Sequence, residues 1–323
     1  MNVILIGAGR MGLRHLRGLA EVEGTVVVVD PRSAAEADVR RAAAEQGVKT
    51  CIEFRTSLDD APFGLGFDAA ILATTARGRL EQLCRVAEEG IKDVLIEKPL
   101  EQSRARFRAI AETARQHGLR ARCDHYRRTL PFFAELKKSG GPFQIVVSSG
   151  AFGLACNGVH WIDFALHLTD SRQPRMLFGE IEPTIIRSGR GPEFRDYGGR
   201  AVFGFEDGSR LFLSSSADSS APTSVTIVQP TRHCVVDQEA DLAIVYERNP
   251  ASAKPSYLCG ADYTRREVKG IETAPLWEIT RGWIRSLRGQ EACLLPTLEE
   301  AVPGHELLFD LLEISGETEF PIT

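Results

Sequence analysis

The chain lacks a long apolar run, an excess of positive charge and any closely spaced pair of cysteines. No stretch of its 323 residues approaches the roughly 20 consecutive apolar residues that a membrane helix needs. The apolar start at Val3–Ile6 is too short for a signal peptide. We therefore expect a cytoplasmic protein with no membrane partner.

The charge balance excludes a second class of partner. The formal net charge is -5, from 39 Lys and Arg against 44 Asp and Glu. Domains that bind the phosphate backbone of nucleic acids are usually basic, so no nucleic-acid partner is expected.

The seven cysteines are scattered, and none forms a Cys-x-x-Cys pair. An odd number without close spacing indicates reduced thiols and no structural zinc, and no metal site is predicted. The length of 323 residues, with 43% hydrophobic and 26% charged residues, is typical of a globular chain with two domains.

A glycine-rich turn follows the first apolar run. Residues 7–12 have the spacing Gly-x-Gly-x-x-Gly between a predicted strand and a predicted helix. The first glycine permits a tight turn, the second lets the backbone approach a pyrophosphate, and the third lets the helix pack close to the strand. The free N–H groups of the helix N-terminus favour the diphosphate. The turn predicts a dinucleotide cofactor, held by Gly7, Gly9, Arg10, Met11 and Gly12.

The next apolar run, Val26–Val29, ends at Asp30. A carboxylate at the end of a second parallel strand accepts hydrogen bonds from the adenosine ribose hydroxyls and repels a 2′-phosphate, so NAD(H) is preferred. Arg32 is able to accommodate a phosphate, and NADP(H) therefore stays possible.

Strands and helices continue to alternate as far as residue 123. Helices are predicted over 34–46, 80–89 and 103–117, and strands over 49–52, 68–73, 93–96 and 119–123. This alternation indicates a Rossmann-type α/β fold with a doubly wound parallel sheet, which we assign to a domain over 1–122. Ligands bind beyond the carboxyl ends of such strands. The glycine turn, Asp30, Thr74–Thr75 and residues 97–99 should therefore converge on one cleft.

The second half, 123–323, has the pattern of a substrate-binding and oligomerisation domain of α+β type. Residues 200–205 and 210–215 flank Asp207-Gly208, a strong hairpin signal, and further strands are predicted over 143–149, 224–229, 233–236 and 242–246. Helices are predicted over 130–138, 275–287 and 298–314, the last bent or broken at Pro303-Gly304. We expect a large, open, mainly antiparallel sheet with one face free to pack, and hence a homodimer or homotetramer.

Three motifs in this order carry a family resemblance. They are the glycine turn, the segment Glu97-Lys98-Pro99-Leu100 after a strand, and Gly158-Val159-His160-Trp161-Ile162-Asp163. Together they resemble the glucose-fructose oxidoreductase, inositol dehydrogenase and MocA (Gfo/Idh/MocA) family over essentially the whole chain. The resemblance implies an NAD(P)-binding Rossmann domain and a C-terminal domain whose open sheet often packs against another subunit.

The resemblance also implies roles for individual residues. Lys98 would lie near the nicotinamide ribose and the substrate hydroxyl, with Glu97 among the cofactor contacts and a cis peptide before Pro99. His160 would be the acid/base partner, which suits imidazole because its pKa lies near neutrality. Asp163, three residues later on the same helix face, would orient His160 or bind a substrate hydroxyl.

The chain departs from the family pattern at several positions. Cys156 stands where many members have an aspartate, and a thiol is a weak hydrogen-bond partner, so Asn157 is expected to bind the substrate instead. Thr74-Thr75-Ala76 replaces a Thr-Pro-Asn segment, which leaves cofactor contacts through Thr74 and Thr75. His125 and Arg128, near the domain boundary, are candidates for substrate binding.

These observations predict an NAD(H)-dependent oxidoreductase that acts on a CH–OH group of a sugar, sugar derivative or cyclitol, with Lys98 and His160 handling the proton. Two alternatives stay open. One is a sugar hydrolase or lyase that retains its NAD and oxidises a hydroxyl transiently. The other is a dinucleotide-binding regulator without turnover.

Overall fold

The computed structural model describes residues 1–45, 50–137, 140–255, 262–271 and 275–323. The chain divides into two compact units. The first comprises Met1–Tyr126, Pro275–His305 and Thr318–Thr323, and the second Arg127–Ala274 and Glu306–Glu317. The chain thus returns to the first unit near its C-terminus, which the sequence-based division into 1–122 and 123–323 does not include.

The first unit contains a six-stranded sheet in which every neighbouring pair is parallel. Its order β3-β2-β1-β4-β5-β6 is the Rossmann order, and confirms the predicted fold class. The strands are β1 (Val3–Ile6), β2 (Thr25–Val29), β3 (Cys51–Arg55), β4 (Ala69–Leu72), β5 (Asp93–Ile96) and β6 (Arg120–Cys123).

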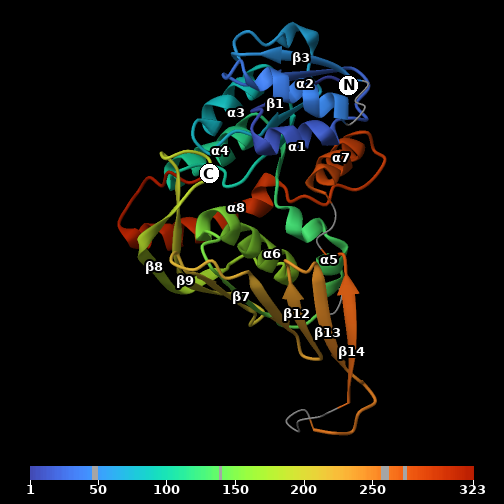
Figure 1. Cartoon of the computed structure of the whole chain (residues 1–323), viewed down its shortest axis with the longest axis vertical. Helices are drawn as coiled ribbons and strands as arrows, with labels where there is room; N and C mark the ends of the chain where they lie inside the picture. Colours follow the sequence, from blue (N-terminus) through green and yellow to red (C-terminus); the bar gives the residue numbers. More distant parts are fainter. Residues whose placement is uncertain (46–49, 138–139, 256–261, 272–274) are drawn as a thin grey trace. The chain divides into compact units, whose positions relative to one another are not determined.

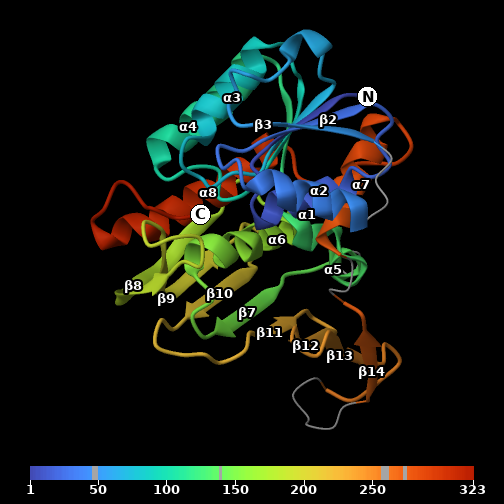
Figure 2. The ribbon, with the colours of Figure 1, turned by 45° about the horizontal axis from the view of Figure 1, so that its top comes forward.

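The central strands of this sheet are apolar at almost every position because helices cover both of its faces. Every residue of β1 and β4 is buried. Helices α3 and α4 lie together on one side of the sheet, and α1 and α2 on the other (Figure 2). Their bounds are α1 (Arg10–Gly18), α2 (Ala35–Glu45), α3 (Arg79–Glu88) and α4 (Arg104–Gln116).

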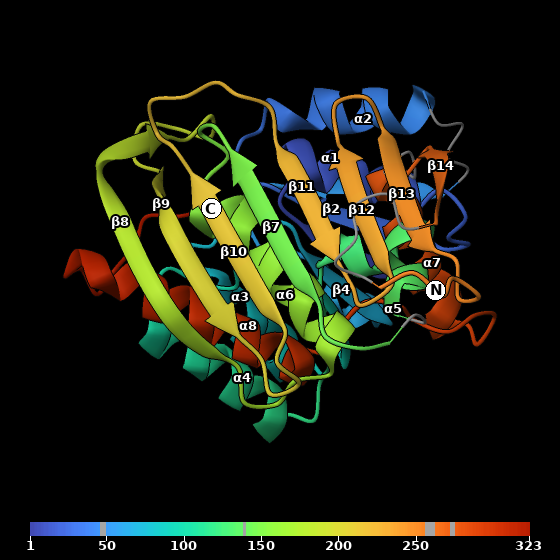
Figure 3. The same cartoon turned by 90° about the horizontal axis from the view of Figure 1, so that it is seen from below.

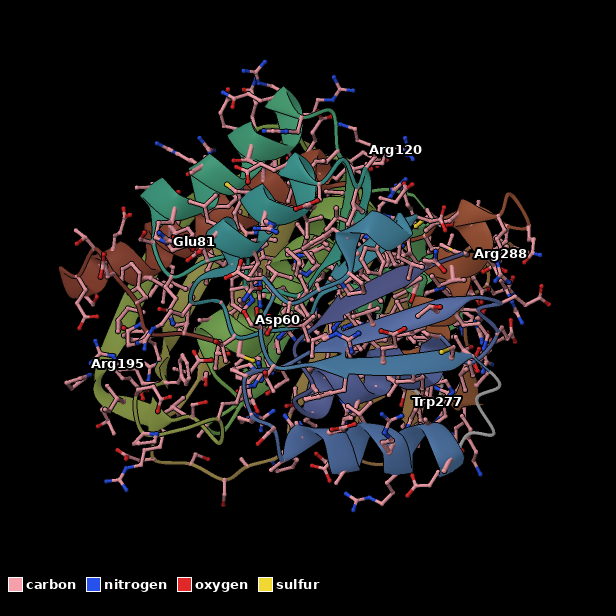
Figure 4. The ribbon with its side chains drawn as sticks, turned by 90° about the horizontal axis from the view of Figure 1, so that it is seen from above. Asp60, Glu81, Arg120, Arg195, Trp277 and Arg288 are labelled. Atoms are coloured by element: carbon pink, nitrogen blue, oxygen red, sulfur yellow. The ribbon has the colours of Figure 1, made fainter. Side chains whose placement is uncertain are left out.

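Helix α7 (Leu276–Leu287) belongs to the first unit, although it comes late in the sequence. It lies beside α1 (Figure 1), and Trp283 joins Leu16 and Leu19 in one buried apolar cluster. The guanidinium of Arg17 lies 5.7 Å from the ring centre of Trp277, which Figure 4 labels. This packing ties the C-terminal region to the helix that begins at the glycine turn.

The second unit is built on an eight-stranded sheet of order β14-β13-β12-β11-β7-β10-β9-β8. Every pair is antiparallel except β7 and β10, which are parallel, as expected for a mainly antiparallel sheet. The strands are β7 (Gln144–Ser149), β8 (Arg175–Arg187), β9 (Arg195–Gly204), β10 (Arg210–Ser215), β11 (Ser224–Val228), β12 (Arg232–Asp237), β13 (Leu242–Arg248) and β14 (Tyr263–Lys269).

Figure 3 shows this sheet from the face opposite α6 (Val159–Thr169). Helix α6 is buried at nearly every position, and α5 (Pro131–Lys137) packs beside it. Strand β7 alternates between exposed and buried residues, with Ile145 and Val147 buried. Alternation of this kind means that the second face of the sheet is open.

Three details differ from the sequence-based expectations. Helix α8 (Leu298–Leu312) runs through Pro303 as one helix, so of the predicted break or bend the break is wrong. Strands β8 and β14 were not predicted.

Among the described residues, no helix is long and apolar enough to cross a membrane.

Candidate functional site

The glycine turn between β1 and α1 leaves no room for side chains except at its centre. Gly7 has φ +102°, and a Cβ there would lie 2.9 Å from the Ala73 carbonyl carbon. A Cβ on Gly12 would lie 1.9 Å from the Gly7 carbonyl oxygen. A Cβ on Gly9, in contrast, would meet nothing within 4 Å. The open space beside Gly9 fits a diphosphate that approaches the backbone closely.

Helix α1 begins at this open space. Its first turn carries no acidic residue, and no side chain caps Gly9. The positive end of the helix dipole is therefore not opposed by a carboxylate of that turn, as an anion site requires. Arg10 is exposed and Met11 half-buried at the helix start, where the sequence analysis expected cofactor contacts.

Asp30, directly after β2, connects the end of that strand to the glycine turn. Its Oδ2 accepts a hydrogen bond of 2.8 Å from the Ala8 N–H, while Arg32 donates through Nε and a terminal nitrogen at 2.9 Å. Burial opposes ionisation of Asp30, but these hydrogen bonds outweigh it and lower the pKa of the carboxyl. The ionised carboxylate is thus present at the edge of the sheet where a ribose would lie.

The loop after β4 is held in place by hydrogen bonds from Arg79. Arg79 is 1% exposed, and its guanidinium donates to the carbonyl oxygens of Thr74 at 2.5 Å, Glu97 and Pro99. The Thr74 hydroxyl donates to Gln82, and Thr75 is half-buried. Arg79 therefore joins the predicted Thr74–Thr75 and Glu97–Pro99 segments at one edge of the sheet.

The segment after β5 holds Lys98 in a buried setting. Lys98 is 8% exposed, and the peptide bond between it and Pro99 is cis, as the resemblance implies. The Lys98 backbone N–H donates to Glu97 Oε2 at 3.2 Å. A second anchor is His305, whose Nε2 accepts from the Leu100 N–H at 3.2 Å.

Three buried titratable groups lie next to Lys98. His15 Nε2 is 3.3 Å from Glu97 Oε1 and 3.9 Å from Asp124 Oδ2, and its Nδ1 is 2.8 Å from the Thr280 hydroxyl. These residues come from α1, the ends of β5 and β6, and α7. We call His15, Glu97 and Asp124 the buried triad.

The two carboxyl groups of the triad have pKa values shifted in opposite directions. Burial opposes charge on both His15 and Glu97, but their hydrogen bond and mutual attraction raise the pKa of His15 and lower that of Glu97. For Asp124, burial and the negative charge of Glu97 outweigh the attraction of His15 and Lys98, and raise its pKa to about 7. Asp124 Oδ1 is buried without a hydrogen-bond partner among the described residues.

His125, a predicted substrate contact, lies in a different cluster of the same unit. Its ring centre is 5.6 Å from that of His305, and Cys123 lies close to both. His305 uses Nε2 for the Leu100 N–H and Nδ1 for the Ala301 carbonyl at 3.0 Å. Because both of its ring nitrogens serve the fold, we interpret this cluster as packing.

In the second unit, His160 lies on α6 and is 5% exposed. A π-helical turn, Leu154–Gly158, leads into α6. Asp196 on β9 holds this turn, because its carboxylate accepts the N–H groups of Ala155 and Cys156 at 2.8 Å each. Asp196 is thus the carboxylate that fixes the start of the helix carrying His160.

The other predicted residues of this unit have their own partners. Arg128 donates to Asp163 through two nitrogens, at 2.6 and 3.0 Å, in a buried ion pair. Asp163 therefore joins Arg128, whereas the sequence analysis expected it to orient His160 or bind a hydroxyl. Asn157 is exposed and its amide donates to the Phe152 carbonyl, and Cys156 is half-buried.

His15, Arg79 and Asp196 were not predicted from the sequence. A histidine three residues after Gly12 lies on the inner face of α1, which is a weak signal in the sequence alone. Arg79 and Asp196 gave no signal, because their partners are backbone groups brought near by the fold.

Comparison with known proteins agrees with the Rossmann fold of the first unit. Residues 1–125 match the model of the Gfo/Idh/MocA family, an oxidoreductase family with an NAD-binding Rossmann fold. Rhizopine catabolism protein MocA of Rhizobium meliloti is 27% identical over 200 residues, 57% of this chain and 58% of that protein. An NAD(+)-dependent scyllo-inositol 2-dehydrogenase of Bacillus subtilis is 29% identical over 137 residues, 42% of this chain and 38% of that enzyme.

The matches to these curated relatives thus span between 38% and 58% of their lengths. Solved structures extend the likeness of fold to the whole chain. UDP-N-acetylglucosamine 3-dehydrogenase of Acidithiobacillus ferrooxidans matches with a TM-score of 0.71 and 18% identity, over 97% of this chain and 96% of that chain. Levoglucosan dehydrogenase, solved with NADH and levoglucosan, matches with a TM-score of 0.70 and 16% identity, over 98% and 97%.

The first unit therefore has the Rossmann fold of the NAD-binding domain that this family model describes. The likeness to the Gfo/Idh/MocA oxidoreductase family covers residues 1–125 of the 323 residues of this chain.

Substitution of Gly12 and of Gly9 should have different effects on stability. Gly12→Ala places a methyl group 1.9 Å from the Gly7 carbonyl, so the turn must open; we expect lower stability by about 2 kcal/mol and loss of NADH binding. Gly9→Ala is the matched control for stability, because its methyl group enters open space. It should fold as the wild type does but bind NADH at least tenfold more weakly. Urea unfolding measures the stability of each variant, and fluorescence titration measures its affinity for NADH. Equal stability of the two variants contradicts the prediction.

Proposed function

We propose that the protein is an NAD(H)-dependent oxidoreductase that acts on a hydroxyl or keto carbon of a sugar, sugar derivative or cyclitol. The observation that carries the proposal is the hydrogen bond between Asp30 and the Ala8 N–H. It joins a glycine turn without room for side chains to an ionised carboxylate at the next strand end. That combination is suited to a diphosphate and a ribose diol.

The preference for NAD(H) rests on the charge of Asp30. A 2′-phosphate would meet a carboxylate that is only 4% exposed and held in its ionised form. Arg32 is bound to this carboxylate, so its charge is already balanced and attracts a phosphate weakly. We expect NADP(H) to bind, but less tightly.

Lys98 and His160 are the residues that we assign to the proton. The nicotinamide, when bound, supplies or accepts the hydride. Lys98 would donate a hydrogen bond to the oxygen on which charge develops, and its buried position strengthens that interaction. His160 would take up or return the proton of the hydroxyl group as general base or acid.

The substrate class is inferred from relatives. The scyllo-inositol and levoglucosan dehydrogenases carry a cyclitol and a sugar in their names, and the UDP-N-acetylglucosamine enzyme a sugar nucleotide. These compounds have several hydroxyl groups in common. We propose that the substrate of this chain is a small polyol in the cytoplasm.

We also propose that the open face of the second unit's sheet binds another copy of this chain. Cross-strand neighbours form an apolar row across that face, from β13 to β8. Val146 and Phe178 in this row are 41% and 51% exposed. An exposed apolar stripe of this extent is typical of an interface between subunits. The row consists of Ile244, Val235, Thr226, Val146, Phe212, Val202 and Phe178.

Replacing Lys98 tests the catalytic assignment. We expect Lys98→Ala to abolish NAD reduction with a panel of sugars and cyclitols, while NADH affinity stays within about tenfold, roughly 1.4 kcal/mol. Lys92→Ala, which removes an amine that bonds the His117 carbonyl at the other end of β5, is the control and should keep full activity. Turnover of Lys98→Ala at the wild-type rate refutes the role.

Replacing Asp30 tests the cofactor preference. Asp30→Asn keeps an acceptor for the Ala8 N–H but removes the charge, so the ratio of NADPH to NADH affinity should rise about tenfold or more. Asp38→Asn on α2 controls for a loss of net charge. Fluorescence titration with both cofactors gives the ratio, and an unchanged ratio rejects the assignment.

Sedimentation velocity tests the interface. We expect the wild type to sediment as a dimer or tetramer, and Val146→Arg, at the centre of the row, as a monomer. Leu65→Arg changes an apolar residue of similar exposure in the first unit and should leave the assembly intact. A monomeric wild type contradicts the proposal.

A further inference from the structure

The buried triad of His15, Glu97 and Asp124 places three titratable side chains together in the interior, beside the segment that carries Lys98. All three side chains are less than one tenth exposed. Glu97 is bound to His15 and accepts the Lys98 backbone N–H, so its negative charge is fixed in place. Asp124 is held less firmly, because its Oδ2 is 3.9 Å from His15 Nε2 and its Oδ1 has no hydrogen-bond partner among the described residues.

The groups around Asp124 come from several elements. Glu97 and Lys98 follow β5, the strand paired with β6, and the Asp124 N–H donates to the Ile96 carbonyl at the end of β5 at 2.9 Å. His15 approaches Asp124 from α1, and the charges of Glu97, His15 and Lys98 all act on its carboxyl. Behind these, Arg79 of α3 acts on Glu97, Arg14 of α1 acts on His15, and the uncharged Thr280 of α7 bonds His15. Its hydrogen bond to His15 and the surrounding positive charges keep Glu97 ionised, while Asp124 is able to gain or lose a charge.

We propose that Asp124 is the proton-exchanging member of the buried triad and that its charge controls how firmly the Lys98 amine holds its proton. The proton of Asp124 exchanges with bulk water, and no other bond changes. When Asp124 is ionised, its charge stabilises the ammonium form of Lys98. When Asp124 is neutral, that support is lost. Asp124 is thus a positioning residue that acts through Lys98, and its effect on turnover rests on the function proposed above.

The sign of the effect follows from burial and charge. Asp124 has a pKa raised to about 7, so it becomes ionised as the pH rises through neutrality. Above neutrality its charge delays loss of the Lys98 proton. Removing that charge should move the alkaline titration of Lys98 down by at least about one pH unit, because opposite charges act strongly on each other in a buried setting.

The seven lysines of the chain make this measurable without turnover. With ¹³C at lysine Cε, each side chain gives its own NMR signal, and the signal lost in Lys98→Arg identifies Lys98. We expect the Lys98 signal of the wild-type protein to show a small inflection near neutrality before its alkaline titration. In Asp124→Asn the inflection should disappear and the alkaline titration should fall by one unit or more.

Two further variants sharpen the test. Asp93→Asn, at the opposite end of β5, removes one carboxylate of the same unit and should titrate as the wild type does. His15→Gln removes a positive charge 3.9 Å from Asp124 Oδ2, so the inflection should move to higher pH. A wild-type Lys98 signal without an inflection, or an Asp124→Asn curve that overlays the wild-type curve, overturns the inference. The wild-type spectrum tests it even if a variant fails to fold.

Kinetics separate this inference from the proposed function. The alkaline limb of kcat should move down in Asp124→Asn by the same shift as the Lys98 signal, with NADH affinity within twofold of the wild type. If the NMR shift is present but no polyol is turned over, the proposed function fails and the control of Lys98 by Asp124 stands. If turnover is normal and the limb does not move, Asp124 has no influence on the reaction.

Discussion

The close approach of α1 to the end of β1 is the constraint on which the first unit depends. A single methyl group on Gly12 would overlap the Gly7 carbonyl, so the helix N-terminus lies directly against the strand end. This geometry leaves the space beside Gly9 open, and it carries His15 from the same helix into contact with Glu97. One glycine contact therefore sets both the anion-binding end of α1 and the surroundings of Lys98.

Charge at the carboxyl ends of the strands is arranged in two different ways. Asp30 is stabilised as a carboxylate by the Ala8 N–H and Arg32, which suits the ribose contact that we propose for it. Glu97 and Asp124 share one histidine, and burial together with the charge of Glu97 raises the pKa of Asp124 to about 7. Parallel strands bring these side chains to one edge, because all of their carboxyl ends lie on the same side of the sheet.

The second unit supports its helix α6 with buried polar contacts. Asp196 binds the N–H groups at the start of the helix, and Arg128 pairs with Asp163 one turn further on. A buried ion pair with two hydrogen bonds is costly to break, since either partner alone would leave a charge in an apolar interior. These contacts fix the segment that carries His160, although Cys156 provides no carboxylate there.

Much of the fold could be predicted from local pattern. The strands of the first unit, its glycine turn and the hairpin at Asp207-Gly208 were recognisable because periodicity and turn residues act over a few positions. Strand β8 escaped because Pro183 and register shifts interrupt its alternation, and β14 because an edge strand rich in charge does not resemble a buried one.

The sequence by itself determined the Rossmann order, the anion-binding turn and the residue types at each strand end, because these depend on neighbours in the chain. Only the tertiary structure decided which of those residues meet. His15 and Glu97 are 82 positions apart, and Arg128 and Asp163 are 35 apart. A carboxyl group's proton affinity depends on burial and on charges a few ångströms away, and these distances exist only after the chain has folded.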